Sequence, residues 1–145
     1  MLLSLCLWAT LSAPGVSAAP VYPPRNGDPC ALNLRVPVPI SLTASGQVIA
    51  GVAGEYTYIC HIAIVSATAQ NIALVEGTGT TCGTSTAGMA GGATAATGWN
   101  FALETGIVEG AGNAWVLATA TKGDNVCLLS SSTGQISGVI DYAQQ

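Results

Sequence analysis

The chain has 145 residues, enough for one domain with its own core; 50% of them are hydrophobic, 7% are charged, and the formal net charge is −4. Typical soluble domains carry about 25% charged residues, so hydroxyls, amides and backbone must cover this surface, as in secreted or assembled β-proteins. The cations Arg25, Arg35 and Lys122 form no basic patch, which argues against nucleic acid or an anionic membrane surface as a partner.

The chain opens with an apolar run, Leu2 to Leu11, followed by small residues up to Ala19. This pattern is typical of a secretory signal peptide, with Val16 and Ala18 at the −3 and −1 positions and cleavage before Ala19, although no Lys or Arg precedes the run. The run is too short to span a membrane, and a buried N-terminal strand or helix is the alternative. We predict a signal peptide at 1–18, a proline-rich extended lead-in at 19–33, and a β-domain at 34–145.

The first predicted strand, Leu34 to Leu42, alternates apolar residues on one face with Arg35, Pro37, Pro39 and Ser41 on the other. Proline cannot donate a backbone hydrogen bond, so two prolines of one parity fit a strand only at the edge of a sheet. A second short strand is expected at Gln47 to Val52.

The stretch from Tyr56 to Cys82 contains two β-rich runs joined by a short polar connection. In a strand, one face of the first run would carry Tyr56, Tyr58, Cys60, Ile62 and Ile64. In the second run, Ile72, Leu74 and Glu76 alternate with Asn71, Ala73 and Val75. Two adjacent runs of this kind predict an antiparallel hairpin that buries a face against other strands.

The remaining segments continue the β pattern after a long Gly/Thr loop at Gly77 to Gly92. We expect this loop to be a surface loop that a disulfide at Cys82 holds in place, and a ligand-binding loop is the alternative. In the last predicted strand, Ile136, Ile140 and Tyr142 share the core parity, and Gly138 stands where a large side chain would not fit. Short strands are expected at Gly98 to Ala102, Ile107–Val108, Asn113 to Thr121, Asn125 to Ser130 and Gln135 to Ala143. About eight short strands without a helical period predict an all-β fold, an antiparallel β-sandwich of jelly-roll type.

Four cysteines remain once Cys6 is assigned to the leader: Cys30, Cys60, Cys82 and Cys127. An even number in an exported chain predicts two disulfides, for which three connectivities are open; free buried thiols are the alternative. Because Cys60 and Cys127 both lie in the middle of predicted strands, we favour that pair, which leaves Cys30 with Cys82. No C-x-x-C spacing supports a zinc or thioredoxin-like site.

The titratable residues do not predict catalysis. His61 is the single histidine, on the parity opposite Cys60 and Ile62, and no Gly-x-Ser-x-Gly elbow accompanies it. The acidic residues are scattered and contain no Asp-x-Asp pattern for calcium. We therefore expect no catalytic residue, metal or cofactor.

Aromatic residues are the candidate contacts for a ligand or partner. Trp99, Trp115 and Tyr142 could stack sugars or anchor a protein if they lie on an exposed sheet face. In a sandwich of this size, aromatic residues are more often part of the core, and that is the competing interpretation.

Several motifs together carry a resemblance, over Cys30 to Gln145: YIC, VEGTGTTCGTSTAGMAGG, ATGWNF, GDNVCLL and SGVIDYAQ. The chain resembles a group of small, mostly uncharacterised all-β proteins of tailed-phage and prophage type. That resemblance implies a β-sandwich used for assembly or binding. The signal-like leader departs from what a virion protein assembled in the cytoplasm needs, and leaves a plain secreted protein equally open.

The sequence therefore predicts a non-enzymatic structural or interaction module, exported or virion-associated, that serves in decoration, assembly or adhesion. Its partner would be a protein, through self-assembly or on a virion or cell surface, or a glycan; nucleic acid and stable membrane insertion after removal of the leader are not expected. A carbohydrate-binding module is the main alternative and needs a Trp coplanar with a Tyr on an exposed face. A small secreted hydrolase is disfavoured because no nucleophile–base pair is evident.

Overall fold

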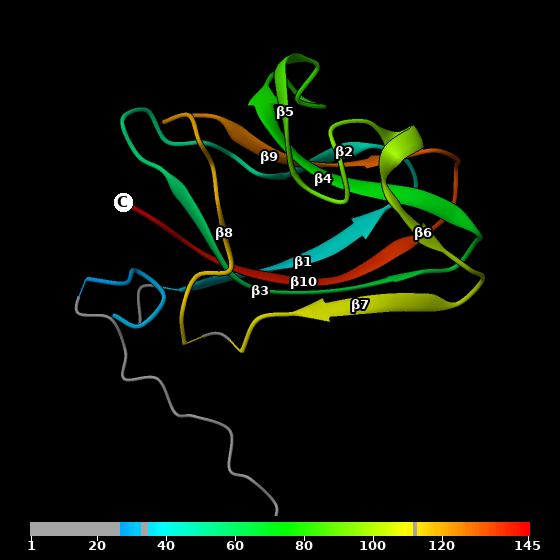
Figure 1. Cartoon of the computed structure of the whole chain (residues 1–145), viewed down its shortest axis with the longest axis horizontal. Helices are drawn as coiled ribbons and strands as arrows, with labels where there is room; N and C mark the ends of the chain where they lie inside the picture. The colour runs from blue at the N-terminus through cyan, green and yellow to red at the C-terminus, as the bar shows by residue number, and fades with distance from the viewer. Residues whose placement is uncertain (1–26, 33–34, 112) are drawn as a thin grey trace, which may run out of the picture.

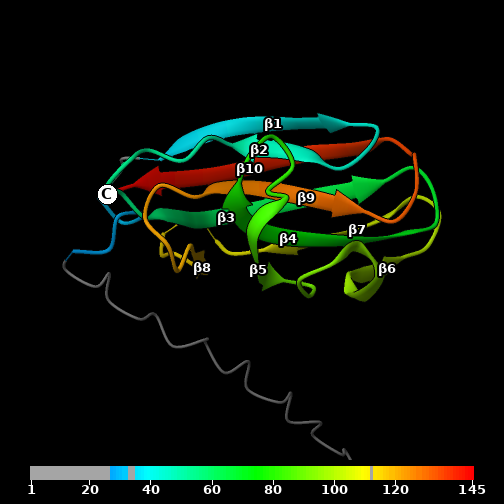
Figure 2. The ribbon, with the colours of Figure 1, turned by 90° about the horizontal axis from the view of Figure 1, so that it is seen from above.

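A computed structural model describes residues 27–32, 35–111 and 113–145, so the expected signal peptide at 1–18 and the lead-in before residue 27 lie outside it. The described residues form ten strands, one short 3-10 turn (η1, Ala95–Thr97) and no α-helix. The strands make two antiparallel five-stranded sheets stacked face to face (Figure 1, Figure 2). The predicted all-β sandwich is confirmed, with ten strands in place of about eight.

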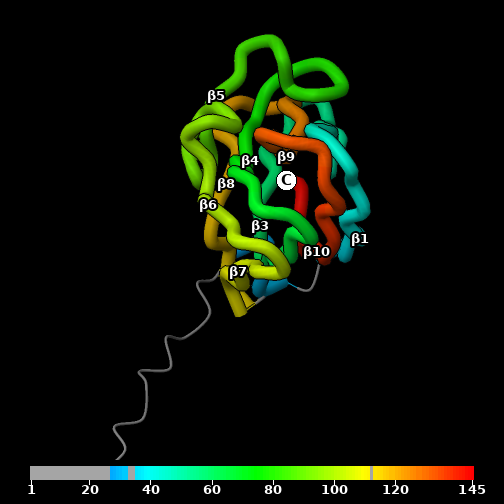
Figure 3. The backbone as a smooth tube through the Cα atoms, turned by 90° about the vertical axis from the view of Figure 1, so that its right-hand side faces the viewer, coloured from blue at the N-terminus to red at the C-terminus, as the bar shows by residue number. Residues whose placement is uncertain are grey.

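Each sheet has a path of four strands and one short strand beside it. The first sheet runs β1 (Val36–Leu42), β10 (Ile136–Gln144), β3 (Thr57–Ser66), β7 (Thr105–Glu109), and β8 (Leu117–Ala118) also pairs with β3. The second sheet runs β2 (Gly46–Ile49), β9 (Asn125–Ser130), β4 (Gln70–Thr78), β5 (Thr84–Ala90), and β6 (Trp99–Phe101) also pairs with β4. The first strand lies beside the last (Figure 3) and the second beside the last but one, which is the winding of a jelly roll.

The core lies between the sheets and consists mainly of β-branched and Leu side chains. Period-two alternation directs every second residue of each strand inward, and the inward residues of the four central strands are almost completely buried. They are Ile62 and Ile64 of β3, Ile72 and Leu74 of β4, Val126 and Leu128 of β9, and Ile136 and Ile140 of β10.

The predicted hairpin between the two runs of 56–82 is wrong. The first run forms β3 in one sheet and the second forms β4 in the other, so the connection crosses between the layers. At this corner the Gln70 side-chain amide donates to the Ser66 hydroxyl, which donates to the Thr68 carbonyl, both at 2.7 Å. Stacking the runs buries the apolar face of each against the other, whereas a hairpin would leave both facing one way.

The predicted common face of the first run is also wrong in part. The register between β3 and β10 shifts by one residue between Asp141 and Tyr142, so that Cys60 has no partner of its own. Such a bulge reverses the alternation on one side of it. Ile59 therefore joins Ile62 in the core, while Cys60 packs outside the sheet with Tyr58.

Two other segments differ from the sequence prediction. The expected loop at 77–92 contains β5, which pairs with β4 as a hairpin. The expected strand at 113–121 is reduced to β8, held on β3 by backbone bonds from Val116 to Ile59 and from Thr119 to Thr57. The prediction that the proline-bearing first strand lies at a sheet edge is confirmed, since β10 is the one strand of residues 35–111 and 113–145 that pairs with β1.

Candidate functional site

The outward side of the first sheet carries apolar side chains in a continuous row across four strands. The register places Pro39 of β1 beside Val139 of β10, Val139 beside Ala63 of β3, and Ala63 beside Val108 of β7. In the next row, Val65 of β3 lies beside Gly106 of β7. Val65 is 52% exposed and Val108 is 71% exposed. We call Pro39, Ala63, Val65, Val108 and Val139 the outer apolar face.

A shallow hollow of about 360 Å³ lies in this face, lined almost entirely by apolar groups of β10, β3 and β7. Two glycines contribute to it. A Cβ on Gly106 would collide with the carbonyl oxygen of Ile64, and one on Gly138 with that of Ala63. The prediction that a large side chain does not fit at Gly138 is confirmed. Gly106 has the outward parity of Val65, and the absence of a side chain there leaves the surface of the sheet depressed.

The outward side of the second sheet is also apolar, but it is covered. Ala73 and Val75 of β4 and Cys127 of β9 are fully buried there in one cluster with Cys82, which belongs to the turn that joins β4 to β5. Cys82 ends that turn with a left-handed backbone (φ 51°), where its amide donates to the carbonyl of Gly79 at 3.1 Å.

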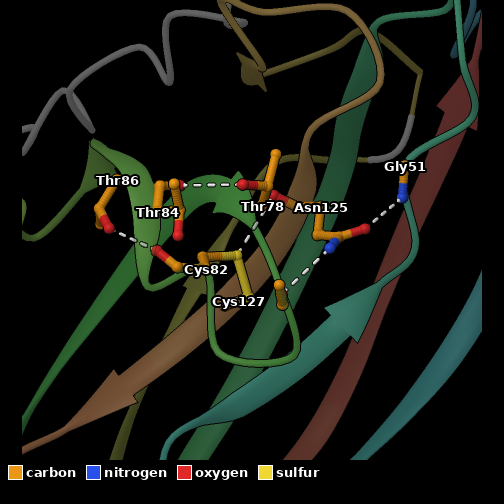
Figure 4. The surroundings of a disulfide bond; sticks show 8 residues. Gly51, Thr78, Cys82, Thr84, Thr86, Asn125 and Cys127 are labelled. Atoms are coloured by element: carbon orange, nitrogen blue, oxygen red, sulfur yellow. Dashed lines mark hydrogen bonds between the residues drawn. A yellow bond between two sulfur atoms is a disulfide. The ribbon is translucent and has the colours of Figure 1, made fainter.

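The turn is attached to two strands, β9 and β2. A disulfide joins Cys82 to Cys127 of β9 (Figure 4). The Gln47 amide of β2 donates to the Thr80 carbonyl at 3.0 Å, and the side-chain amide of Asn125 donates to the Gly79 carbonyl at 3.1 Å. The expectation that Cys82 pins this glycine-rich segment is confirmed.

All four predicted cysteines form disulfides, but the predicted pairing is wrong. The pairs are Cys30–Cys60, with Cα atoms 5.5 Å apart, and Cys82–Cys127, with Cα atoms 6.0 Å apart. The bulge in β3 turns Cys60 to the outside of the first sheet, while Cys127 lies on the outside of the second. Two cysteines on opposite outer faces, with sheets about 10 Å apart between them, cannot bond.

Residues 27–32 form a turn rather than the extended, unpacked lead-in expected there. Asp28 and Cys30 are buried, and the Asp28 carboxylate accepts hydrogen bonds from the backbone amides of Cys30 (2.9 Å) and Trp115 (3.4 Å). The Cys30–Cys60 disulfide and this carboxylate together hold the turn against β3 and the segment that leads into β8.

The three aromatic residues singled out from the sequence lie in separate places. Trp99 packs edge-on against Phe101 in the second sheet, and Tyr142 packs against the core in the first. Trp115 is 41% exposed and meets Tyr58 edge-on, with ring centroids 6.1 Å apart and planes at 64°. Tyr58 in turn meets Tyr56, whose ring lies 5.0 Å from the Lys122 Nζ. The three thus make no common binding surface.

The titratable side chains are held in structural positions. His61 is half-buried and lies beside Asp141 on the neighbouring strand. The buried Glu76 carboxylate accepts hydrogen bonds from the backbone amides of Ala120 (2.7 Å) and Thr121 (3.4 Å), which ties the segment before β9 to β4. Within the described residues, no three His, Cys, Asp or Glu side chains gather as metal ligands.

Comparison with known proteins finds no family model, curated protein or solved structure that matches the chain. In the part of the chain that the structure describes, no helix has the length and apolar character needed to cross a bilayer.

Sequence reasoning overlooked the outer apolar face, although a signal for it was present. In β3 the outward residues Ala63 and Val65 are apolar like the inward Ile62 and Ile64. A strand with one solvated face alternates apolar and polar residues, and the apolar residues on both parities of β3 depart from that pattern.

Proposed function

We propose that this protein is a non-enzymatic structural or interaction module, exported or virion-associated, which contacts a protein partner through the outer apolar face. The observation that carries the proposal is the row Pro39, Val139, Ala63 and Val108 across four strands, with Val65 beside it. Contiguous exposed apolar surface is uncommon on monomeric soluble proteins and marks interaction sites.

The compartment is inferred from the covalent structure. Two disulfides fit an oxidising environment, since cytosolic thiols are normally kept reduced. The signal-like leader at 1–18 and the 7% content of charged residues support export or assembly. The resemblance to small phage-type proteins supports the virion as one such location.

Fold-level analogy agrees with this assignment but does not carry it. Jelly rolls recur in viral capsid and lectin domains, and one fold serves many functions. The lectin-like alternative needs a flat aromatic platform, whereas Tyr58 and Trp115 meet at 64°. That angle favours a protein partner over a sugar stacked on both rings.

Site-specific photo-crosslinking tests the proposal. A photoreactive amino acid replaces Val65, on the outer apolar face, or Val52, which is 42% exposed in the loop after β2 and serves as the matched control. In the particle or surface fraction that contains the native protein, position 65 should crosslink to one defined protein and position 52 should not. Equal crosslinking at both positions would contradict the proposal.

Glycan-array binding is the second arm of this test. The intact chain should bind no glycan. Glycan binding that is lost in Trp115→Ala and retained in Val65→Lys would overturn the proposed function in favour of a carbohydrate-binding module.

A further inference from the structure

The first sheet ends in two edges that differ in how they are protected. At one edge, β1 carries Pro37 and Pro39, which have no N–H to offer another strand. At the other edge, β7 has the sequence Thr-Gly-Ile-Val-Glu and, among the described strands, pairs with β3 alone (Figure 1). An edge without proline presents backbone donors and acceptors to an added strand.

The register identifies which backbone groups of β7 point to the open edge of the sheet. The carbonyl of Ile64 lies against β7, where it would meet a Cβ on Gly106, while the carbonyl of Ala63 lies against Gly138 of β10. Ile64 is paired with Ile107. In an antiparallel pair the backbone groups alternate in direction, so those of Ile107 point to β3 and those of Gly106 and Val108 point to the open side.

We propose that the partner at this edge is a second copy of the chain. The β7 strands of the two copies pair antiparallel about a two-fold axis that passes midway between the two Ile107 residues. In this register, Gly106 of each copy lies opposite Val108 of the other, which gives two hydrogen-bonded pairs. Ile107 of one copy lies opposite Ile107 of the other. The two five-stranded sheets then form one continuous sheet of ten strands.

Side-chain size supports this register. Val108 is 71% exposed and stands on the outer side of the sheet, directly beside the open edge. Opposite it, Gly106 of the second copy has no side chain and lies beside Val65 in the apolar hollow. The valine of each copy would therefore fill the hollow of the other and lose most of its exposed apolar surface.

Charge supports the same register. Glu109 of one copy faces Thr105 of the other, so no two carboxylates lie directly opposite each other in the paired strands. The pairing also joins the outer apolar faces of the two copies into one surface. The inference rests on the proposed function, because it names a partner for the β7 edge of the outer apolar face.

Sedimentation velocity on the full exported chain, with both disulfides intact, tests the inference. The chain should show a concentration-dependent monomer–dimer equilibrium. Val108→Lys should raise the dimer dissociation constant at least tenfold, because it puts an ammonium group where Gly106 and Val65 of the second copy lie. The matched control is Val36→Lys, a 47% exposed valine on the proline-bearing edge strand, which should change the constant less than twofold. At protein concentrations well below the dimer dissociation constant, both variants should keep the wild-type melting temperature, since both valines are exposed in the monomer.

A crosslink tests the register. Residues in a non-hydrogen-bonded antiparallel pair have Cα atoms about 4.5 Å apart, within disulfide range. Ile107→Cys should therefore give a covalent dimer on mild oxidation, whereas Val36→Cys should not. A chain that stays monomeric up to about 1 mM, or a dimer unaffected by Val108→Lys, overturns self-pairing. Failure here with position 65 still crosslinked to a different protein would leave the proposed function standing. An intact dimer in which position 65 crosslinks to the second copy and to no other protein would leave self-pairing standing and contradict a separate protein partner on the outer apolar face.

Discussion

The outer faces of the two sheets both carry apolar side chains, but the described residues cover them differently: on the first sheet the turn at 27–32 covers the end around Cys60 and leaves the outer apolar face open. On the second sheet, Ala73 and Val75 are fully buried under the turn that Cys82 attaches to β9. On the first sheet, Val65 and Val108 remain more than half exposed. The same type of side chain thus has a structural role on one face and is left available on the other.

This difference shows that the chain can cover an apolar sheet face with its own residues where it needs to. Among the described residues the cover of the second sheet consists of one tight turn, one disulfide and hydrogen bonds from β2 and β9. The described part of the chain places no such cover over Val65 and Val108. This contrast is the observation from which we propose a partner for the uncovered valines.

Lysine substitutions at matched valines should give the largest contrast. Val75→Lys, on the covered face, would bury an ammonium group without a partner and should destabilise the fold by about 4 kcal/mol or more. Val65→Lys, on the uncovered face, should change the free energy of unfolding of the monomer by no more than about 0.5 kcal/mol. Urea unfolding of both variants at low protein concentration measures the difference. Similar losses would show that Val65 is covered as well.

Some features of the fold could be predicted from the sequence and others could not, because some depend on neighbouring residues and others on residues far apart in the chain. Alternation is local, and so it identified Ile136 and Ile140 as inward residues of β10; the two prolines, an equally local signal, identified the edge position of β1. Layer assignment is not local: no residue between Ser66 and Gln70 distinguishes a hairpin from a crossing between sheets. Only the need of both strands to bury an apolar face against each other decides it.

The disulfides show the same limit. The four half-cystines could be identified from their number, but pairing depends on which side of a sheet each one faces. A single extra residue at Cys60 reverses that side, and nothing in the local sequence marks the bulge. The outer apolar face, by contrast, could have been found from the apolar outward positions Ala63 and Val65.

Removal of the Cys82–Cys127 disulfide should have the next largest effect. It closes a separation of 45 residues, for which the chain-entropy model gives about 4.0 kcal/mol, against about 3.6 kcal/mol for the 30 residues between Cys30 and Cys60. The two double alanine variants should therefore lose similar stability in urea, with the first losing slightly more.

What distinguishes the two variants is the surface that each exposes. Cys82→Ala/Cys127→Ala loosens the turn over Ala73 and Val75, so it should bind a hydrophobic dye more strongly while still folded. Cys30→Ala/Cys60→Ala loosens the turn at 27–32 instead, where Ala143 is the one fully buried non-cysteine residue of the cluster, so it exposes less apolar surface and should bind less dye. Equal dye binding by both variants would contradict the role of the turn as a cover.

Loss of the Asn125 side chain should have the smallest effect, and it isolates the hydrogen-bonded part of the cover. The Asn125 side chain accepts from the Gly51 amide at 2.9 Å and donates to the Gly79 carbonyl at 3.1 Å, so it joins two loops to the start of β9 (Figure 4). Asn125→Ala removes both bonds at partly exposed positions and should cost about 1–2 kcal/mol. Asn125→Asp keeps the acceptor for Gly51 and loses the donor for Gly79. If the turn depends on that donor, hydrogen exchange at the Cys82 amide should accelerate in both variants, while exchange at the Gly51 amide should accelerate in the alanine variant alone. Unchanged exchange at Cys82 in both variants would mean that the disulfide by itself holds the turn over the second sheet.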